Sequence, residues 1–468
     1  MHAKILAGMA GMFPIVCFAA ELDGSQLPVW WAIPFAGLLL SIALLPLAAP
    51  YFWHHHFGKI SLAWALAFLL PCAAVFGIGA AASGAVHAFT AEYIPFIILL
   101  TSLFVVAGGI CVRGNLRGTP LLNTGLLALG TVLASFMGTT GASMLMIRPL
   151  IRANDNRKHA VHIVVFFIFL VANAGGSLTP LGDPPLFLGF LKGIDFFWTM
   201  KHMFWEAVFL CASLLVIFYL LDSYYYRNRE EQLPPAMDPT PDSALSIEGK
   251  INFLFLGAIV GLVLMSGFWK SGVTFSILGT DVELQNLVRD MLLIAVTIAS
   301  LALTPRTARK GNEFSWGPMQ EVAKLFAGIF ITIIPVIAML RAGESGAFSA
   351  VVRAVTGEEG QPIDAMYFWA TGILSSFLDN APTYLVFFNT AGGDPASLMT
   401  TLASTLAAIS CGAVFMGANS YIGNAPNLMV KAIAEERGIR MPSFFGYMAW
   451  SCIVLVPLFI AMTFLFFR

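Results

Sequence analysis

The sequence is poor in charge. Only 11% of its 468 residues are Asp, Glu, Lys or Arg, whereas a soluble domain carries about 25%. Apolar residues make up 58% of the chain, in long runs rather than at amphipathic spacing, and the mean hydropathy is +0.82. The formal net charge of -1 leaves no large basic face for nucleic acid. This composition argues against a water-soluble enzyme and excludes a nucleic-acid partner.

Several chemical signatures are missing as well. The six cysteines lie far apart and form no C-x-x-C pair, so the sequence indicates neither a disulfide framework nor a zinc site. No H-E-x-x-H and no Walker sequence occurs, which counts against a metalloprotease and against transport driven by nucleotide hydrolysis on this chain. An intramembrane enzyme would need a base at membrane depth, and the deep positions offer carboxylates and hydroxyls. We therefore expect no enzyme and no cofactor.

The sequence does contain apolar runs of about 20 residues, the length of a membrane span. The first two spans are expected at 29–52 and 60–82, and residues 1–28 fit either a cleaved signal peptide or a short first membrane segment. Most Lys and Arg residues fall in loops that alternate to one side, as the positive-inside rule requires. These features predict an all-α polytopic protein whose partner is the lipid bilayer, naturally that of a bacterial inner membrane.

Two blocks of the sequence are expected to enter and leave the membrane on the same side. Arginines flank block 119–153 at both ends, so both ends belong on the cytoplasmic side and the block is predicted to be a re-entrant hairpin with its turn at 138–143. Block 363–391 has the same character and is expected to turn at 379–383.

Two further runs, 158–190 and 397–437, are too long for one span and are interrupted by Gly, Pro and Asn, which predicts broken helices. The order span, span, span, hairpin, broken span, span fills 29–222 and again 250–468. Each half makes an odd number of crossings, so the halves are predicted to be inverted-topology repeats, a common build of secondary transporters. Residues 223–249 are expected to be a disordered cytoplasmic linker.

The two interruptions resemble each other in sequence. Residues 173–185 read NAGGSLTPLGDPP and residues 417–427 read GANSYIGNAPN, and alignment on glycine places Asp183 opposite Asn424. Unwound backbone survives in the hydrocarbon core only where it is buried in protein or lines a wet cavity. Such a break presents carbonyls and helix ends to ions. Two matched breaks, each preceded by a polar hairpin, favour an ion site over packing kinks.

Two acidic residues, Asp183 and Asp379, lie deep in apolar sequence. A carboxylate at the bilayer centre costs about 2.5–3.5 kcal/mol on insertion scales. Its hard oxygens suit sodium, and burial favours the neutral form, so protons would compete for the same site. The alternative is a neutral, hydrogen-bonded aspartic acid that caps a broken helix. Hydroxyl and amide side chains nearby are candidate uncharged ligands, although some are expected only to form hydrogen bonds between helices. They are Thr139, Thr140, Ser143, Asn173, Ser177, Thr179, Asn380, Thr383, Asn419, Ser420, Asn424 and Asn427.

The hairpins and broken helices, together with the sequence at 173–186, resemble the ion transporter superfamily. That superfamily includes NhaD-type sodium/proton antiporters, arsenite permeases, citrate/metal carriers and divalent-anion/sodium symporters. The run is most similar to the NhaD-type antiporter branch that is often described as "putative citrate transport". The resemblance implies an elevator-type transporter, in which hairpins and broken helices move against a scaffold, commonly as a homodimer.

One departure from the superfamily bears on the cargo. Its divalent-anion symporters carry Ser-Asn-Thr at both hairpin tips, but here the tips read Thr139–Ser143 and Asp379–Thr383. The charge of Asp379 would repel a carboxylate anion, and no Lys or Arg lies at matching depth. We therefore predict a sodium/proton antiporter in which Asp183 and Asp379 bind sodium and protons in competition. The alternatives are a symporter of citrate or another di- or tricarboxylate, an arsenite permease and a passive channel.

Overall fold

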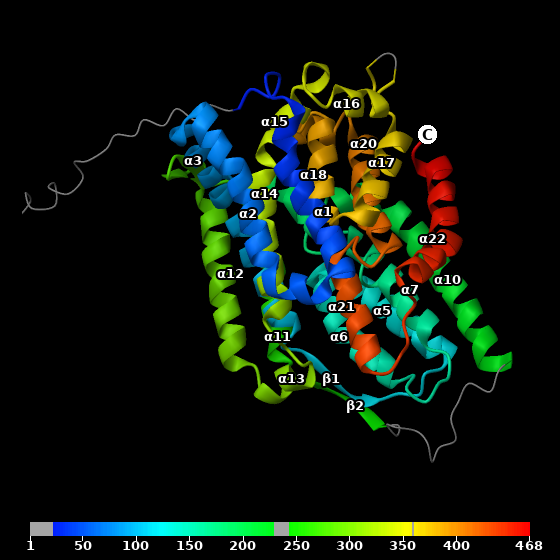
Figure 1. Ribbon diagram of the computed structural model, residues 1–468. Coiled ribbons are helices and arrows are strands. Elements are labelled where there is room, and N and C mark those ends of the chain that lie inside the picture. Colours follow the sequence, from blue (N-terminus) through cyan, green and yellow to red (C-terminus); the bar gives the residue numbers. More distant parts are fainter. Residues whose placement is uncertain (1–21, 229–242, 358–359) are drawn as a thin grey trace, which may run out of the picture.

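The chain is a bundle of long helices (Figure 1), and the computed structural model describes residues 22–228, 243–357 and 360–468. Within these residues, 8 helices are long and apolar enough to cross a membrane, and helices α14 and α15, bent by 43° at their junction, form a possible ninth span. The predicted all-α polytopic class is confirmed. The segment predicted at residues 1–28 lies largely outside the described residues.

The described part of the chain before the linker consists of helices and one strand. They are η1 (Val29–Ala32), α1 (Ile33–Ala48), α2 (Pro50–Phe76), α3 (Ile78–His87), the π-helical turn η2 (Ala88–Tyr93), α4 (Ile94–Ala107), β1 (Cys111–Asn115), α5 (Pro120–Met137), α6 (Thr139–Arg152), α7 (Val161–Leu170), η3 (Ala174–Ser177), α8 (Pro184–Leu191), α9 (Trp198–His202) and α10 (Phe204–Asn228).

The elements after the linker follow in the same way. They are β2 (Ser243–Glu248), α11 (Ile251–Phe268), β3 (Thr274–Ile277), β4 (Thr280–Glu283), α12 (Leu284–Leu303), α13 (Arg306–Gly311), α14 (Gly317–Thr332), α15 (Ile334–Arg341), η5 (Gly343–Ser345), α16 (Ser349–Val355), α17 (Asp364–Phe377), α18 (Asn380–Thr390), α19 (Pro395–Met399), α20 (Ala403–Met416), η6 (Gly417–Asn419), α21 (Ala425–Glu436) and α22 (Phe444–Phe466).

The first two spans do not have the predicted boundaries. Helix α1 ends at Ala48, the chain turns at Ala49 with φ -146° and ψ 64°, and α2 begins at once with Pro50. Proline is favoured at the first position of a helix, because its missing N–H would have no partner there. The segment between 52 and 60, expected to be a loop, is therefore the first part of α2.

The linker predicted at 223–249 is more ordered than expected. Helix α10 continues to Asn228, and β2 pairs antiparallel with β1, with Cys111 opposite Glu248. The expectation of a disordered tether is wrong for these two ends, while 229–242 lie outside the described residues. A strand forms here because β1 offers unpaired backbone groups that a passing extended segment can satisfy. We call the end of the bundle that carries β1, β2 and α13 the strand end (Figure 1).

The two hairpins turn more tightly than predicted. Helices α5 and α6 meet at Gly138, whose φ of 80° lies in the region that glycine adopts without strain. Because this single residue reverses the chain, 139–143 are already helical rather than part of the turn. Helices α17 and α18 meet at Leu378 and Asp379, and Asp379 caps α18.

The two broken helices are interrupted in the same way. Asp183 caps α8 with φ -145° and ψ 143°, and Asn424 caps α21 with φ -151° and ψ 138°. The Thr179 hydroxyl donates to the Ser135 carbonyl, and the Ser420 hydroxyl donates to the Ser376 carbonyl. Each hydroxyl also accepts the backbone N–H two residues further on, at 3.2 Å in both cases. Each break is thus fastened to the first arm of the preceding hairpin.

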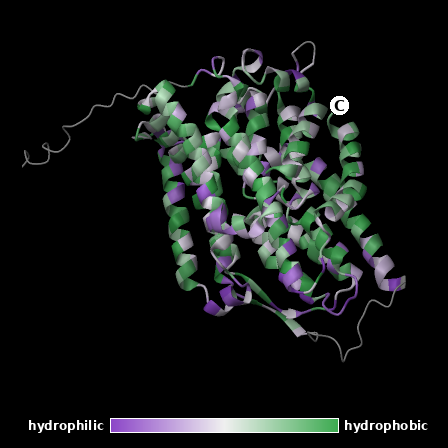
Figure 2. Cartoon of the chain, viewed as in Figure 1, coloured by the Kyte–Doolittle hydropathy of each residue, from purple (hydrophilic) through white to green (hydrophobic). Residues whose placement is uncertain are grey.

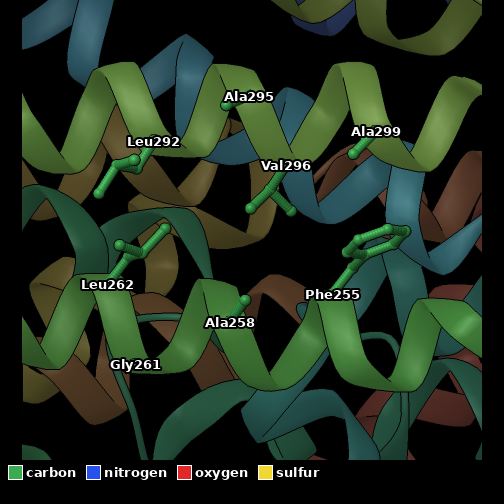
Figure 3. Close-up of a pocket in the computed structure, with 8 residues that line it drawn as sticks. All are labelled: Phe255, Ala258, Gly261, Leu262, Leu292, Ala295, Val296 and Ala299. Carbon is green, nitrogen blue, oxygen red and sulfur yellow. The ribbon is translucent and has the colours of Figure 1, made fainter.

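Apolar residues dominate the long helices, and hydrophilic residues gather near the strand end (Figure 2). A shallow groove between α11 and α12 is lined by apolar residues (Figure 3). They are Phe255, Ala258, Gly261, Leu262, Leu292, Ala295, Val296 and Ala299. These lining side chains contain no oxygen or nitrogen atom that could bind an ion.

A charged cluster is buried between α5, α7 and α10. The Arg157 guanidinium donates to both oxygens of Asp222, at 2.6 and 3.1 Å, and neither side chain is exposed. His162 Nε2 lies 2.8 Å from the same carboxylate, and Asn123 Nδ2 donates to it at 3.0 Å. Breaking a buried pair leaves an uncompensated charge, which costs about 3–5 kcal/mol.

We expect Asp222→Asn to lower the free energy of unfolding by about 3–5 kcal/mol, because Arg157 then loses its counter-charge. The control is Glu435→Gln, which removes a partner of Lys431 on an exposed helix face and should change stability by at most about 1 kcal/mol. Thermal unfolding followed by intrinsic fluorescence measures both. Equal melting of the two variants would contradict the expectation.

Candidate ion-binding site

The site is organised around the Asp183 carboxylate, which is 2% exposed. The Thr139 hydroxyl donates to its Oδ1 at 2.8 Å, and Asn424 Nδ2 donates to the same oxygen at 3.2 Å. Asn380 Nδ2 donates to Oδ2. Three neutral donors, widely separated in the sequence, therefore surround one buried carboxylate.

Each of these residues lies at the start of a helix. Thr139 and Asn380 are the first residues of α6 and α18, and Asp183 and Asn424 are the caps of α8 and α21. The N-terminus of a helix carries a partial positive charge of about half an elementary charge. Helix starts that meet at Asp183 stabilise its negative charge, which offsets part of the cost of burying it.

An amide network extends from Asp183 between the two breaks. The Asn424 amide also contacts Asn173 Oδ1 at 3.2 Å, and Asn173 Nδ2 donates to Asn427 Oδ1 at 2.7 Å. Asn427 Nδ2 donates in turn to two backbone carbonyls of the second break, both at 2.9 Å. The first break is therefore hydrogen-bonded directly to the second.

The second acidic residue, Asp379, is half-buried and directly precedes Asn380. Its Oδ1 accepts the Ala381 N–H at 3.1 Å, the usual contact of an N-cap aspartate. Asn380, the residue after Asp379, donates from its side-chain amide to the Asp183 carboxylate. The structure thus brings both deep acids together.

Several oxygens around the network are buried without a hydrogen-bond partner in the described protein. They are Ser143 Oγ, Ser177 Oγ and Asn380 Oδ1. Ser143 lies one helical turn after Thr139, and Asn380 contacts Asp183 through its other amide atom. In the described residues no group of three or more His, Cys, Asp or Glu is placed to hold a metal ion. The ligands on offer are one or two carboxylates with hydroxyl and amide oxygens, which suit a small hard cation.

Close backbone contact shapes both breaks. A methyl group at Gly182 would lie 2.1 Å from the Gly176 carbonyl oxygen, and one at Gly423 would lie 2.5 Å from the Gly417 carbonyl oxygen. The atoms that a methyl group would meet belong to the backbone, so they cannot rotate away as a side chain could. Glycine is therefore required where the two backbone segments approach each other this closely.

The other predicted residues lie near the breaks but outside this network. Thr179 and Ser420 fasten the breaks to the hairpins. Thr383 donates to the Asp379 carbonyl, and Asn419 donates to the Ser376 hydroxyl. Thr140 is half-buried beside Thr139. These side chains shape the backbone around the carboxylates.

Two serines that accept the fastening hydrogen bonds, Ser135 and Ser376, were not among the predicted site residues. The sequence does contain a signal for them, because 135–138 read SFMG and 376–379 read SFLD. These two segments are separated by the same number of residues as Asp183 and Asn424, so the alignment of the two breaks also pairs Ser135 with Ser376. The buried partner of Arg157, Asp222, left no such signal, since only the packing of the segment before α7 against α10 brings the two together.

Apolar spanning helices with a buried polar site between two interrupted helices are the architecture of a multi-pass membrane transporter. The chain belongs to the family described as "putative citrate transport", whose profile it matches over residues 24–467. It is also similar to a Synechocystis sp. protein named "Uncharacterized transporter slr0753", with 23% identity over 366 residues, which is 73% of this chain and 77% of that protein. The predicted classes, a transporter and a multi-pass membrane protein, are confirmed.

The glycine contacts generate a prediction. Gly182→Ala and Gly423→Ala should each lower the yield of monodisperse protein and its thermal midpoint, because backbone must shift to admit the methyl group. The control is Gly257→Ala, since no atom lies within 4 Å of a methyl group there. Fluorescence-detected size-exclusion chromatography measures all three. Wild-type behaviour of both break variants would show that the breaks are less tightly closed than described.

Proposed function

We propose that the chain is a secondary active transporter of the bacterial inner membrane that exchanges sodium for protons at Asp183 and Asp379. The observation that carries the proposal is the ligand set: a buried carboxylate, a second carboxylate next in sequence to one of its donors, and neutral oxygens without a hydrogen-bond partner. Sodium and protons both neutralise a carboxylate. Each therefore reduces the same cost of a buried charge.

Competition at one site is sufficient for exchange. Sodium binding requires carboxylate oxygens free of protons, and protonation removes the charge that holds sodium. If the loaded forms change orientation and the empty form does not, sodium moving one way returns protons the other way. The empty form is expected not to change orientation, because its buried carboxylate is not neutralised and is therefore the most costly state to move.

The motion belongs to the same proposal. The hairpins, the broken helices and the helices that follow them, at 120–228 and 364–466, form what we call the binding body. The remaining helices, at 29–107 and 251–341, form the scaffold. Hydrogen bonds between the breaks and hairpins favour movement of the binding body as one rigid unit, as in an elevator, with the two halves as inverted repeats. We further propose a homodimer assembled through the scaffold.

Citrate or another di- or tricarboxylate carried in symport is the second candidate, and the family description favours it. Helix starts of the kind that surround Asp183 attract anions. Here, however, Asp183 itself occupies them, and its three side-chain donors are neutral. Labelled citrate uptake into vesicles without sodium-driven proton flux would favour this candidate, and growth protection on arsenite would favour an arsenite permease.

We expect Asp183→Asn and Asp379→Asn to lower sodium-driven proton flux about tenfold or more, because a contact to a charged group is worth about 1.5–3 kcal/mol. The assay uses reconstituted vesicles that contain a pH-sensitive dye. Asparagine has nearly the shape of aspartate, and at position 379 its side-chain oxygen can still accept the Ala381 N–H, so the fold should survive.

The matched control is Asp394→Asn. Asp394 caps α19 at the surface, where its Oδ2 accepts the Ser397 N–H at 2.9 Å. This variant should keep wild-type flux. Normal sodium-driven flux in both site variants would refute the carboxylate mechanism.

A further inference from the structure

Three ion pairs join the binding body to the scaffold, two of them at Glu313 and one at Glu92. At the strand end, Glu313 lies between α13 and α14. Its Oε1 accepts Arg437 Nη2 at 2.9 Å and its Oε2 accepts Arg148 Nη2 at 3.0 Å. One scaffold carboxylate thus contacts both a hairpin, through α6, and the helix after the second break, α21.

The backbone around Glu313 is held in place. Its φ of 51° is a conformation that residues other than glycine adopt rarely, so its surroundings must maintain it. The preceding side chain, Asn312, donates to the Gly108 carbonyl at the end of α4, at 3.1 Å. The hydrogen bond from Arg148 lowers the pKa of Glu313, so this carboxylate stays charged at neutral pH.

The remaining ion pair involves η2, which lies about midway along the candidate span Ile78–Ala107. Lys192 Nζ donates to Glu92 in η2, the helical turn that leads into α4. Both side chains are more buried than those of the Arg437–Glu313 pair, with exposed fractions of 21% for Lys192 and 13% for Glu92.

The basic partners occupy equivalent places. Lys192 is the C-cap of α8 and Arg437 is the C-cap of α21, and these are the helices that begin at the two breaks. A positive charge at a helix C-terminus is favourable in itself. Each pair therefore connects the far end of a site-forming helix to a carboxylate of the scaffold.

We propose that Glu92 and Glu313 are positioning residues that hold α8 and α21 against the scaffold and must release Lys192 and Arg437 whenever the binding body moves. This inference rests on the rigid-body motion in the proposed function. The attraction between two opposite charges weakens as they separate. The ion pairs therefore resist displacement of the binding body along the scaffold. The pairs thereby set how fast the two orientations exchange, while the ligands around Asp183 set how tightly an ion binds.

The first test reverses charges in the Glu92–Lys192 pair, measured as sodium-driven proton flux in vesicles. Glu92→Lys and Lys192→Glu alone should each change the maximal rate about two- to fivefold, the range of an exposed or half-buried pair. The sodium concentration for half-maximal rate should stay unchanged. The double variant, with both charges exchanged, should return the rate toward wild type. A double variant no closer to wild type than the single variants would overturn the proposal for this pair.

At the strand end the matched pair is Glu313→Gln and Arg440→Gln. Arg440 is an exposed basic residue three positions after Arg437, so its removal changes the local charge by one unit, in the opposite sense, without touching the ion pair. We expect a changed maximal rate for Glu313→Gln and a wild-type rate for Arg440→Gln. Equal rates for both variants would overturn the role of Glu313.

The closing experiment joins the two bodies covalently. A short bis-methanethiosulfonate, which forms a reducible disulfide with each thiol and releases sulfinate, links cysteines introduced by Glu313→Cys and Arg437→Cys in vesicles. The wild-type chain, with its six native cysteines, receives the same treatment. The joined protein should lose sodium-driven flux and regain it on reduction. Full flux in the joined protein would overturn the proposal. If the untreated wild type shows no sodium-driven flux, the proposed exchange is refuted. The positioning role is then tested by citrate uptake, which should be lost in the joined protein and restored on reduction.

Discussion

The structure depends on one buried negative charge. A carboxylate removed from water costs several kcal/mol unless donors surround it. Asp183 accepts hydrogen bonds from Thr139, Asn380 and Asn424, which begin or cap helices of both hairpins and of the second break. None of these helices can move away alone without leaving the charge less well covered, so the site itself holds the binding body together.

That constraint connects the fold to transport. A site held together by its own charge is expected to move as a unit, because separating its parts costs more than sliding the whole. Neutralisation by a cation or a proton lowers the cost of exposing the site to a new environment. The apolar groove between α11 and α12 has no comparable group among its lining residues.

The sequence predicted the features that arise from local chemistry. Glycine and proline mark the interruptions, and aligning the two breaks pairs Asp183 with Asn424, which the structure places at equivalent helix caps. Features that depend on packing were not predicted. The pairing of β1 with β2, the burial of Asp222 and the contacts of Glu313 all join segments far apart in the chain. Which ligands surround Asp183, and which only fasten backbone, also required the three-dimensional arrangement.

The most direct measurement is proton release from purified protein on sodium addition, in weakly buffered detergent solution with a pH indicator. Competition at a shared carboxylate predicts that sodium releases protons from the wild type and that Asp183→Asn abolishes the release. Citrate as its choline salt should release none. Proton release on citrate but none on sodium would contradict the account.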